Sequence, residues 1–133
     1  DEINLYKSIN IDRSSWTYNE KYSKRWKNVG LSKSSKYLKK LILLLKQNDI
    51  KYYLVIYPNP GQIFSNKENI HENYWIEWAK NNNVQLINLY KLFTGENKKK
   101  IIKRYFIPGD VHWNINGHEL VYNELKMEII DKF

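Results

Sequence analysis

Hydrophobic and polar residues along the chain alternate between helix-like and strand-like periods. Over residues 32–47 the apolar side chains fall on one stripe at helical spacing, opposite lysines, and Ser32 or Ser34 can cap this helix. The run 52–57 is short, apolar and rich in aromatic and β-branched residues, which predicts a buried strand. Pro58–Gly61 then predicts a tight turn that ends the strand.

The second half of the chain continues the same alternation of helix and strand. The pattern predicts, in order, a helix over 67–81, a buried strand over 84–89, a helical turn over 90–93, a polar helix over 96–104, a loop over 105–113 and a last helix from 115 that Asn114 caps. The last helix carries an apolar stripe at i+4 steps.

Helices that alternate with buried strands are typical of α/β folds with a parallel sheet. We therefore expect one domain over 1–133, a three-layer α/β/α fold with a parallel sheet. Two parallel strands are too few to be buried properly, so the chain has the pattern of the C-terminal portion of a larger domain. The alternative is an additional strand within residues 1–12. Residues 1–30 are the least informative, and their aromatic residues predict a loop followed by a short helix.

Composition narrows the classes of function. The chain has no Cys, which excludes disulfide scaffolds and thiol catalysis. The formal net charge is +8, but the lysines are scattered, and the dense run Lys98–Lys100 with Lys103 and Arg104 fits the solvated face of a helix. A non-catalytic basic and aromatic module that binds an anionic glycan or nucleic acid remains the alternative function, although no nucleic-acid motif is present. No apolar run is long enough to span a bilayer, and no signal peptide is visible.

The segment from Ile107 to His118 holds the candidate chemistry. A neutral imidazole acts as a general base only when its tautomer and orientation are fixed, and a carboxylate that accepts from Nδ1 fixes both. Asp110 and His112 are two residues apart, so their side chains point to the same side if the loop is extended. The alternative is that Asp110 binds a loop amide and His112 packs beside Trp113.

This segment resembles the last conserved block of the SGNH/GDSL hydrolase superfamily, in which an Asp and a His precede a capped helix. His112 matches the family's base, and Asn114, Gly117 and His118 follow in register. The shorter spacing Asp110-Val111-His112-Trp113 resembles the subset related to alginate O-acetyltransferases. The run Tyr57-Pro58-Asn59-Pro60-Gly61-Gln62 is similar to a segment of the same group.

The resemblance implies a serine esterase or O-acyltransferase that acts on ester groups, O-acetyl groups above all, of a carbohydrate. Asp110 and His112 would be the catalytic pair, and Trp113, Tyr57 and Gln62 would line the substrate site. The family's Gly-Asp-Ser block is not present, so we expect the chain alone to be nearly inactive and the N-terminal half of the same protein to be a partner. An extracytoplasmic or membrane-associated location fits this resemblance.

No cofactor is implied. The three histidines do not have a recognised metal-ligand spacing, so we expect no metal site. We expect His71 to be a surface residue and His118 to have a structural role.

Overall fold

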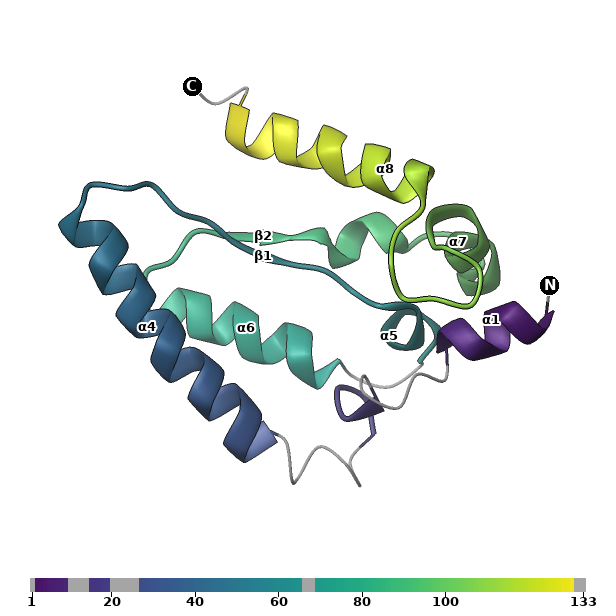
Figure 1. Cartoon of the computed structure of the whole chain (residues 1–133), viewed down its shortest axis with the longest axis horizontal. Coiled ribbons are helices and arrows are strands. Elements are labelled where there is room, and N and C mark those ends of the chain that lie inside the picture. Colours follow the sequence, from purple (N-terminus) through teal and green to yellow (C-terminus); the bar gives the residue numbers. More distant parts are fainter. Residues whose placement is uncertain (1, 10–14, 20–26, 66–68, 131–133) are drawn as a thin grey trace.

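The computed structural model describes residues 2–9, 15–19, 27–65 and 69–130 (Figure 1). The chain is a mixed α/β protein, as the sequence predicts. Its elements in chain order are α1 (Glu2–Ile9), the π-helical turn η1 (Lys27–Leu31), α4 (Ser32–Gln47), β1 (Leu54–Ile56), α5 (Pro60–Phe64), α6 (Ile70–Asn81), β2 (Leu86–Asn88), the 3-10 helix η2 (Leu89–Phe93), α7 (Lys98–Tyr105), α8 (Ile115–Leu125) and the π-helical turn η3 (Lys126–Ile130).

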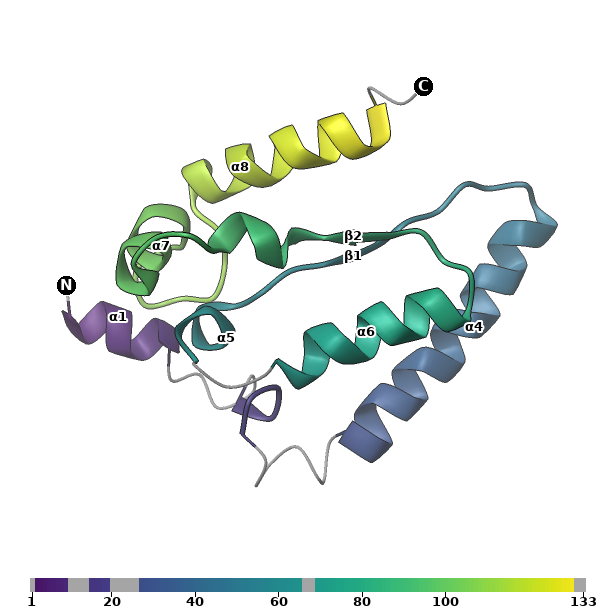
Figure 2. The same cartoon turned by 180° about the vertical axis from the view of Figure 1, so that it is seen from behind.

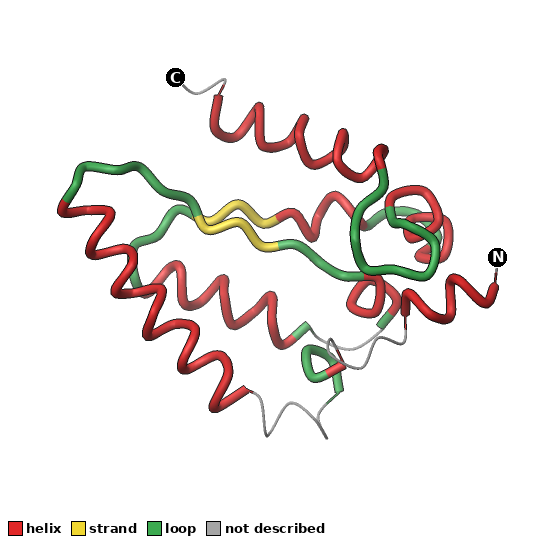
Figure 3. The backbone as a smooth tube through the Cα atoms, in the orientation of Figure 1, coloured by secondary structure: helices red, strands yellow, loops and turns green. Residues whose placement is uncertain are grey.

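The two strands pair in parallel, with Val55 of β1 opposite Ile87 of β2. Figure 3 shows how short they are beside the loops and helices that flank them. Alternate side chains pack on opposite faces of this pair, because successive side chains of a strand point to opposite sides. The parallel sheet confirms the coarse fold prediction, whereas the three-layer fold remains a prediction, since the described residues form two strands only.

Two hydrophobic clusters hold the helices onto the strands. The first includes Ile87, Phe106 and Val121 and joins β2 to α7 and α8. The second includes Ile42, Ile56 and Trp78 and joins α4 and α6 to β1. In Figure 1, α8 accordingly lies on one side of the strands, and α4 and α6 lie on the other. Each face of the sheet is therefore covered, as is usual for parallel strands.

The N-terminal part of the chain differs from the prediction. Glu2–Ile9 is helical, so the alternative of an additional strand within residues 1–12 is wrong over this part. Leu5 is buried in the first cluster, and the helix contacts α5 and α7, which explains why its few apolar residues suffice. Residues 10–12 lie outside the described residues. Of the four aromatic residues expected in a loop and short helix, Tyr22 and Trp26 also lie outside them. The other two, Trp16 and Tyr18, lie in a turn.

The start of α4 also differs. Neither Ser32 nor Ser34 caps it, because the helical path already begins in η1 and the residue at the cap position, Leu31, is itself helical. Its amides therefore continue a preceding turn, and a side-chain acceptor is not needed.

The predicted turn after β1 becomes the short helix α5. Asn59 accepts from the backbone N–H of Gln62, and the Gln62 side chain accepts from the backbone N–H of Asn59, which makes a capping box with Pro60 in the first turn. A Cβ at Gly61 would lie 2.7 Å from the carbonyl oxygen of Ile9. Glycine thus allows α1 and α5 to pack closely.

Candidate functional site

A tight loop between α7 and α8 carries the predicted acid and base. Phe106 and Trp113 form an antiparallel bridge, and the backbone N–H of Ile107 donates to the carbonyl of His112 at 2.9 Å. Inside the loop, the N–H of Asp110 donates to the carbonyl of Ile107 at 3.0 Å. This is a four-residue turn with proline second and glycine third, and Gly109 has the positive φ of 81° that the third position of a type II turn requires. The loop is therefore not extended over 107–110, because the Pro-Gly pair folds it back before Asp110.

The folded loop nevertheless brings the predicted pair into contact. The Oδ1 atom of Asp110 lies 2.9 Å from Nδ1 of His112. The same oxygen accepts from the backbone N–H of Val111 at 2.6 Å. This amide, and after it the His112 side chain, hold the pKa of Asp110 below its ordinary value. The sequence left two partners open for the Asp110 carboxylate, a loop amide or the imidazole of His112. In the structure one oxygen of this carboxylate contacts both.

An ionised Asp110 determines the tautomer of His112. A carboxylate only accepts, so the proton of a neutral imidazole sits on Nδ1 and leaves a lone pair on Nε2. Within the described part of the chain, Nε2 has no hydrogen-bond partner. The His112 side chain is 70% exposed and that of Asp110 42%. The base is therefore oriented, unblocked and accessible.

The start of α8 anchors this loop. The Asn114 side chain accepts from the N–H of Gly117 at 3.1 Å and donates to the carbonyls of Arg104 at 2.9 Å and Phe106 at 3.2 Å. A Cβ at Gly117 would overlap the carbonyl oxygen of Tyr105. Asn114 and Gly117 thus join the end of α7 to the start of α8.

His112 borders a cavity with a volume of about 700 Å³ in the described part of the chain. Its wall combines aromatic side chains with a few polar groups, and comes from the turn over 15–19, β1 and the chain after it, α6, the α7–α8 loop and the start of α8. It includes Trp16, Thr17, Tyr57, Asn59, Gln62, His71, Trp75, Trp113 and His118. Such a wall suits a ligand that offers both apolar surface and hydroxyl groups.

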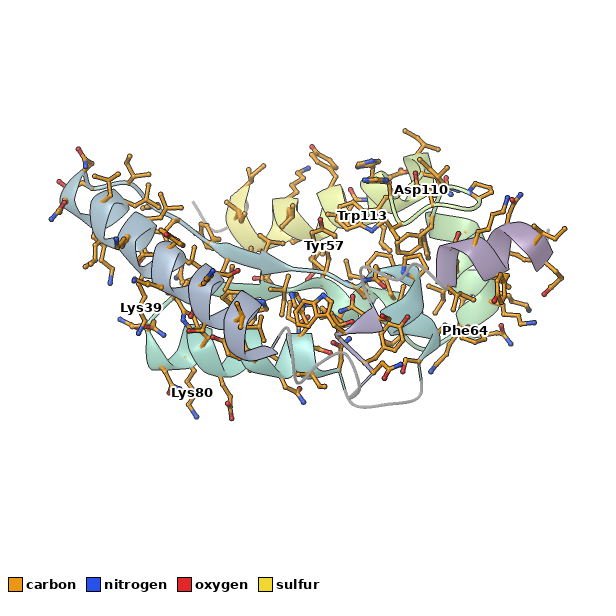
Figure 4. All side chains as sticks on the ribbon, turned by 60° about the horizontal axis from the view of Figure 1, so that its bottom comes forward. Lys39, Tyr57, Phe64, Lys80, Asp110 and Trp113 are labelled. Carbon is orange, nitrogen blue, oxygen red and sulfur yellow. The ribbon has the colours of Figure 1, made fainter. Side chains whose placement is uncertain are left out.

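The structure brings the three predicted substrate-binding residues to this one cavity. The rings of Tyr57 and Trp113 pack with centroids 4.6 Å apart, and Figure 4 shows these two side chains next to each other. Gln62 also lines the cavity, but its side chain is buried and serves the capping box of α5. His118 is exposed, and its ring packs edge-on against Trp113 at 5.6 Å, which fits the expected structural role.

His71 is the residue that sequence reasoning misjudged. It is half-buried in the cavity wall, not a surface residue, because α6 turns it inward beside Trp75. The indole N–H of Trp75 donates to its Nε2 at 3.0 Å, and its Nδ1 lies 3.3 Å from the hydroxyl of Tyr90. Burial lowers the pKa of His71. The i, i+4 spacing of His71 and Trp75 on a predicted helix is the feature of the sequence that could have predicted this contact.

The described cavity wall does not contain a serine. Its hydroxyl side chains are those of Thr17 and Tyr57. Among the described residues, no group of three or more His, Asp or Glu side chains is placed to hold a metal ion. The pair Asp110–His112 is therefore a base and its orienting group, without an assigned nucleophile.

The basic run on α7 is largely engaged with the protein itself. Lys98 donates to the carbonyl of Ser65 at 2.8 Å, Lys99 lies 3.5 Å from the carboxylate of Glu2, and Arg104 lies 3.7 Å from Glu96. These ion pairs are exposed, so each contributes little to stability. This arrangement agrees with the prediction that the basic run is the solvated face of a helix.

Comparisons with protein-family models, curated proteins and solved structures gave no significant match. The resemblance to SGNH/GDSL hydrolases therefore rests on the residues quoted above. None of the helices in the described ranges combines the length and the apolar character that crossing a bilayer requires.

Proposed function

We propose that this chain supplies the acid–base half of a serine-type ester hydrolase or O-acyltransferase of the SGNH/GDSL kind, in a three-layer α/β/α domain. The observation that carries the proposal is the 2.9 Å contact between Asp110 Oδ1 and His112 Nδ1, which leaves Nε2 accessible at the edge of an aromatic cavity. The favoured substrates are esters, O-acetyl groups above all, on a carbohydrate, because sugar rings stack on aromatic side chains through their apolar faces.

In this reaction His112 accepts the proton of a nucleophilic hydroxyl through Nε2 and later returns a proton to the leaving alcohol. Asp110 keeps the imidazole in position and stabilises the imidazolium that forms between the two steps. The nucleophilic serine and the donors that stabilise the oxyanion come from a polypeptide segment outside the described residues. The acceptor, water or a second hydroxyl, decides between hydrolysis and transfer.

The test uses hydrolysis of 4-nitrophenyl acetate, which an oriented neutral imidazole accelerates even without a serine. We expect a slow second-order reaction that His112→Ala reduces to the buffer background. Asp110→Asn should slow it about tenfold, because the amide no longer fixes the tautomer.

His118→Ala is the matched control, since this ring lines the same cavity but has no carboxylate partner in the described structure. It should keep the wild-type rate. Thermal unfolding of each variant establishes that the comparison is between folded proteins. Retention of the full rate in a folded His112→Ala protein would contradict the proposal.

A further inference from the structure

The outer edge of β1 is an unpaired strand edge. Leu54 donates its backbone N–H to the carbonyl of Gln85, toward β2, at 2.9 Å. Backbone groups of successive residues in a strand point to opposite sides, so the N–H and C=O of Val55 point away from β2. Within the described residues they have no hydrogen-bond partner. A strand edge of this kind is a template for another strand.

The cavity described above runs along this same edge. Leu54, Val55 and Ile56 all line it, and Tyr57 continues it toward His112. The hollow therefore gives room beside the unpaired backbone groups, and its wall is mainly apolar and aromatic.

Helix α4, which lies on the side of the molecule where β1 lies, carries an exposed apolar stripe. Tyr37, Leu41 and Leu44 follow one another at helical spacing and are 64%, 49% and 56% exposed. Figure 1 shows α4 and β1 nearer the viewer than α6 and β2, and the reverse view in Figure 2 shows α6 and β2 nearer. The open edge of β1 and the helix that carries the exposed stripe thus belong to one side of the fold.

Charge indicates what kind of partner fits. Helix α4 carries five lysines and no acidic residue. Lys33 and Lys40 lie one turn before Tyr37 and Leu44 and flank the stripe, and no ion pair engages them in the described structure. A second copy of this chain would place like charges together at such an interface, whereas carboxylates would complement them. Lipid would cover the leucines but cannot bond the peptide group of Val55.

We infer that β1 and α4 together form a docking surface for an extended polypeptide segment, which adds a strand to the outer edge of β1 and places carboxylates against the α4 lysines. Main-chain hydrogen bonds at Val55 supply the pairing, and apolar side chains at alternate positions fill the hollow. This inference does not rest on the chemistry of Asp110 and His112, although the segment enters the cavity that His112 borders.

The probe is a capped nine-residue peptide in which Val and Ile alternate with Thr and which ends in two Glu. Titrated into the isotopically labelled protein, it should shift the amide signal of Val55 and slow its hydrogen exchange. Val55→Pro removes the outward N–H and should weaken binding about tenfold, whereas Val55→Ala keeps that N–H and should bind nearly as the wild type does.

The second part of the test replaces lysines of α4 and leaves β1 unchanged, so it applies even if Val55→Pro does not fold. Lys33→Gln with Lys40→Gln should weaken binding and reduce its dependence on salt, while the control Lys80→Gln, on the exposed surface of α6, should change neither. Equal binding to all variants, or no binding to the wild type, overturns the inference. Two further outcomes would also overturn the inference. If sedimentation shows a dimer that Val55→Pro dissociates, the edge of β1 binds a second copy of the chain. If the protein binds phosphatidylserine vesicles but not the peptide, α4 binds lipid.

Discussion

At the scale of single residues, two histidines share one cavity but are prepared for different roles. His112 has one ring nitrogen bonded to Asp110 and the other unoccupied in the described structure, which is what a general base needs. His71 has both nitrogens engaged, by Trp75 and Tyr90. Because Nε2 of His71 accepts from an indole N–H, its proton sits on Nδ1 and the neutral ring is favoured. His71 is therefore a structural residue of the cavity wall.

This arrangement predicts how stability depends on pH. The folded-state pKa of His71 lies below its ordinary value, so the unfolded chain binds a proton more readily than the folded protein does. The contribution of His71 to stability is complete above pH about 6.5 and is lost as pH falls below that value. Thermal unfolding between pH 7.5 and 5 should show this loss in the wild type, and His71→Gln should reduce it.

Two tryptophans of α6 provide the matched comparison for the same residue. Trp75→Phe removes the indole donor and should raise the pKa of His71 toward its ordinary value, as measured by proton NMR of the imidazole. Trp78→Phe should leave that pKa unchanged, because the buried indole N–H of Trp78 has no partner in the described structure. An equal rise in both variants would attribute the pKa to packing alone.

At the scale of elements, the junction between α7 and α8 determines where the base lies. Asn114 caps α8 and at the same time bonds two carbonyls at the end of α7, so one side chain satisfies groups of both helices. Asn116, two residues later, only donates to the carbonyl of Arg104, at 3.3 Å. The two asparagines therefore differ in function although they are neighbours.

Asn114→Ala should lower the free energy of unfolding by about 1–2 kcal/mol, since a cap and two further hydrogen bonds are lost. Asn116→Ala should change it by less than about 0.5 kcal/mol, as an exposed substitution does. Urea unfolding measures both values. Similar losses in the two variants would mean that the junction is not held by Asn114.

At the scale of the whole molecule, positive charge is in excess. The chain has 22 Lys and Arg against 14 Asp and Glu, a formal net charge of +8, and one helix, α4, has five lysines without an acidic residue. Net charge of one sign opposes the compact state through repulsion, which salt screens. We therefore expect repulsion to outweigh the few exposed ion pairs around α7.

Raising NaCl from about 20 mM to about 500 mM should therefore raise the unfolding temperature by a few degrees. Lys36→Gln removes a charge of α4 that is in no ion pair within the described ranges, and it should raise the unfolding temperature at low salt and have little effect at high salt. A fall in unfolding temperature with added salt would show that ion pairs such as Lys91–Glu124, whose atoms lie 2.6 Å apart, dominate instead.

The sequence by itself determined the order of helices and strands from residue 32 onward, apart from the short helix α5, and the candidate pair Asp110 and His112. Both depend on local chemistry: side-chain period, caps such as Asn114, and residue types at short spacing. Only the tertiary structure decided that Glu2–Ile9 is a helix, that His71 faces the cavity, and that a type II turn over 107–110 folds the loop back just before the pair. These features depend on contacts between segments far apart in the chain, and a local pattern does not contain the surfaces against which such segments pack.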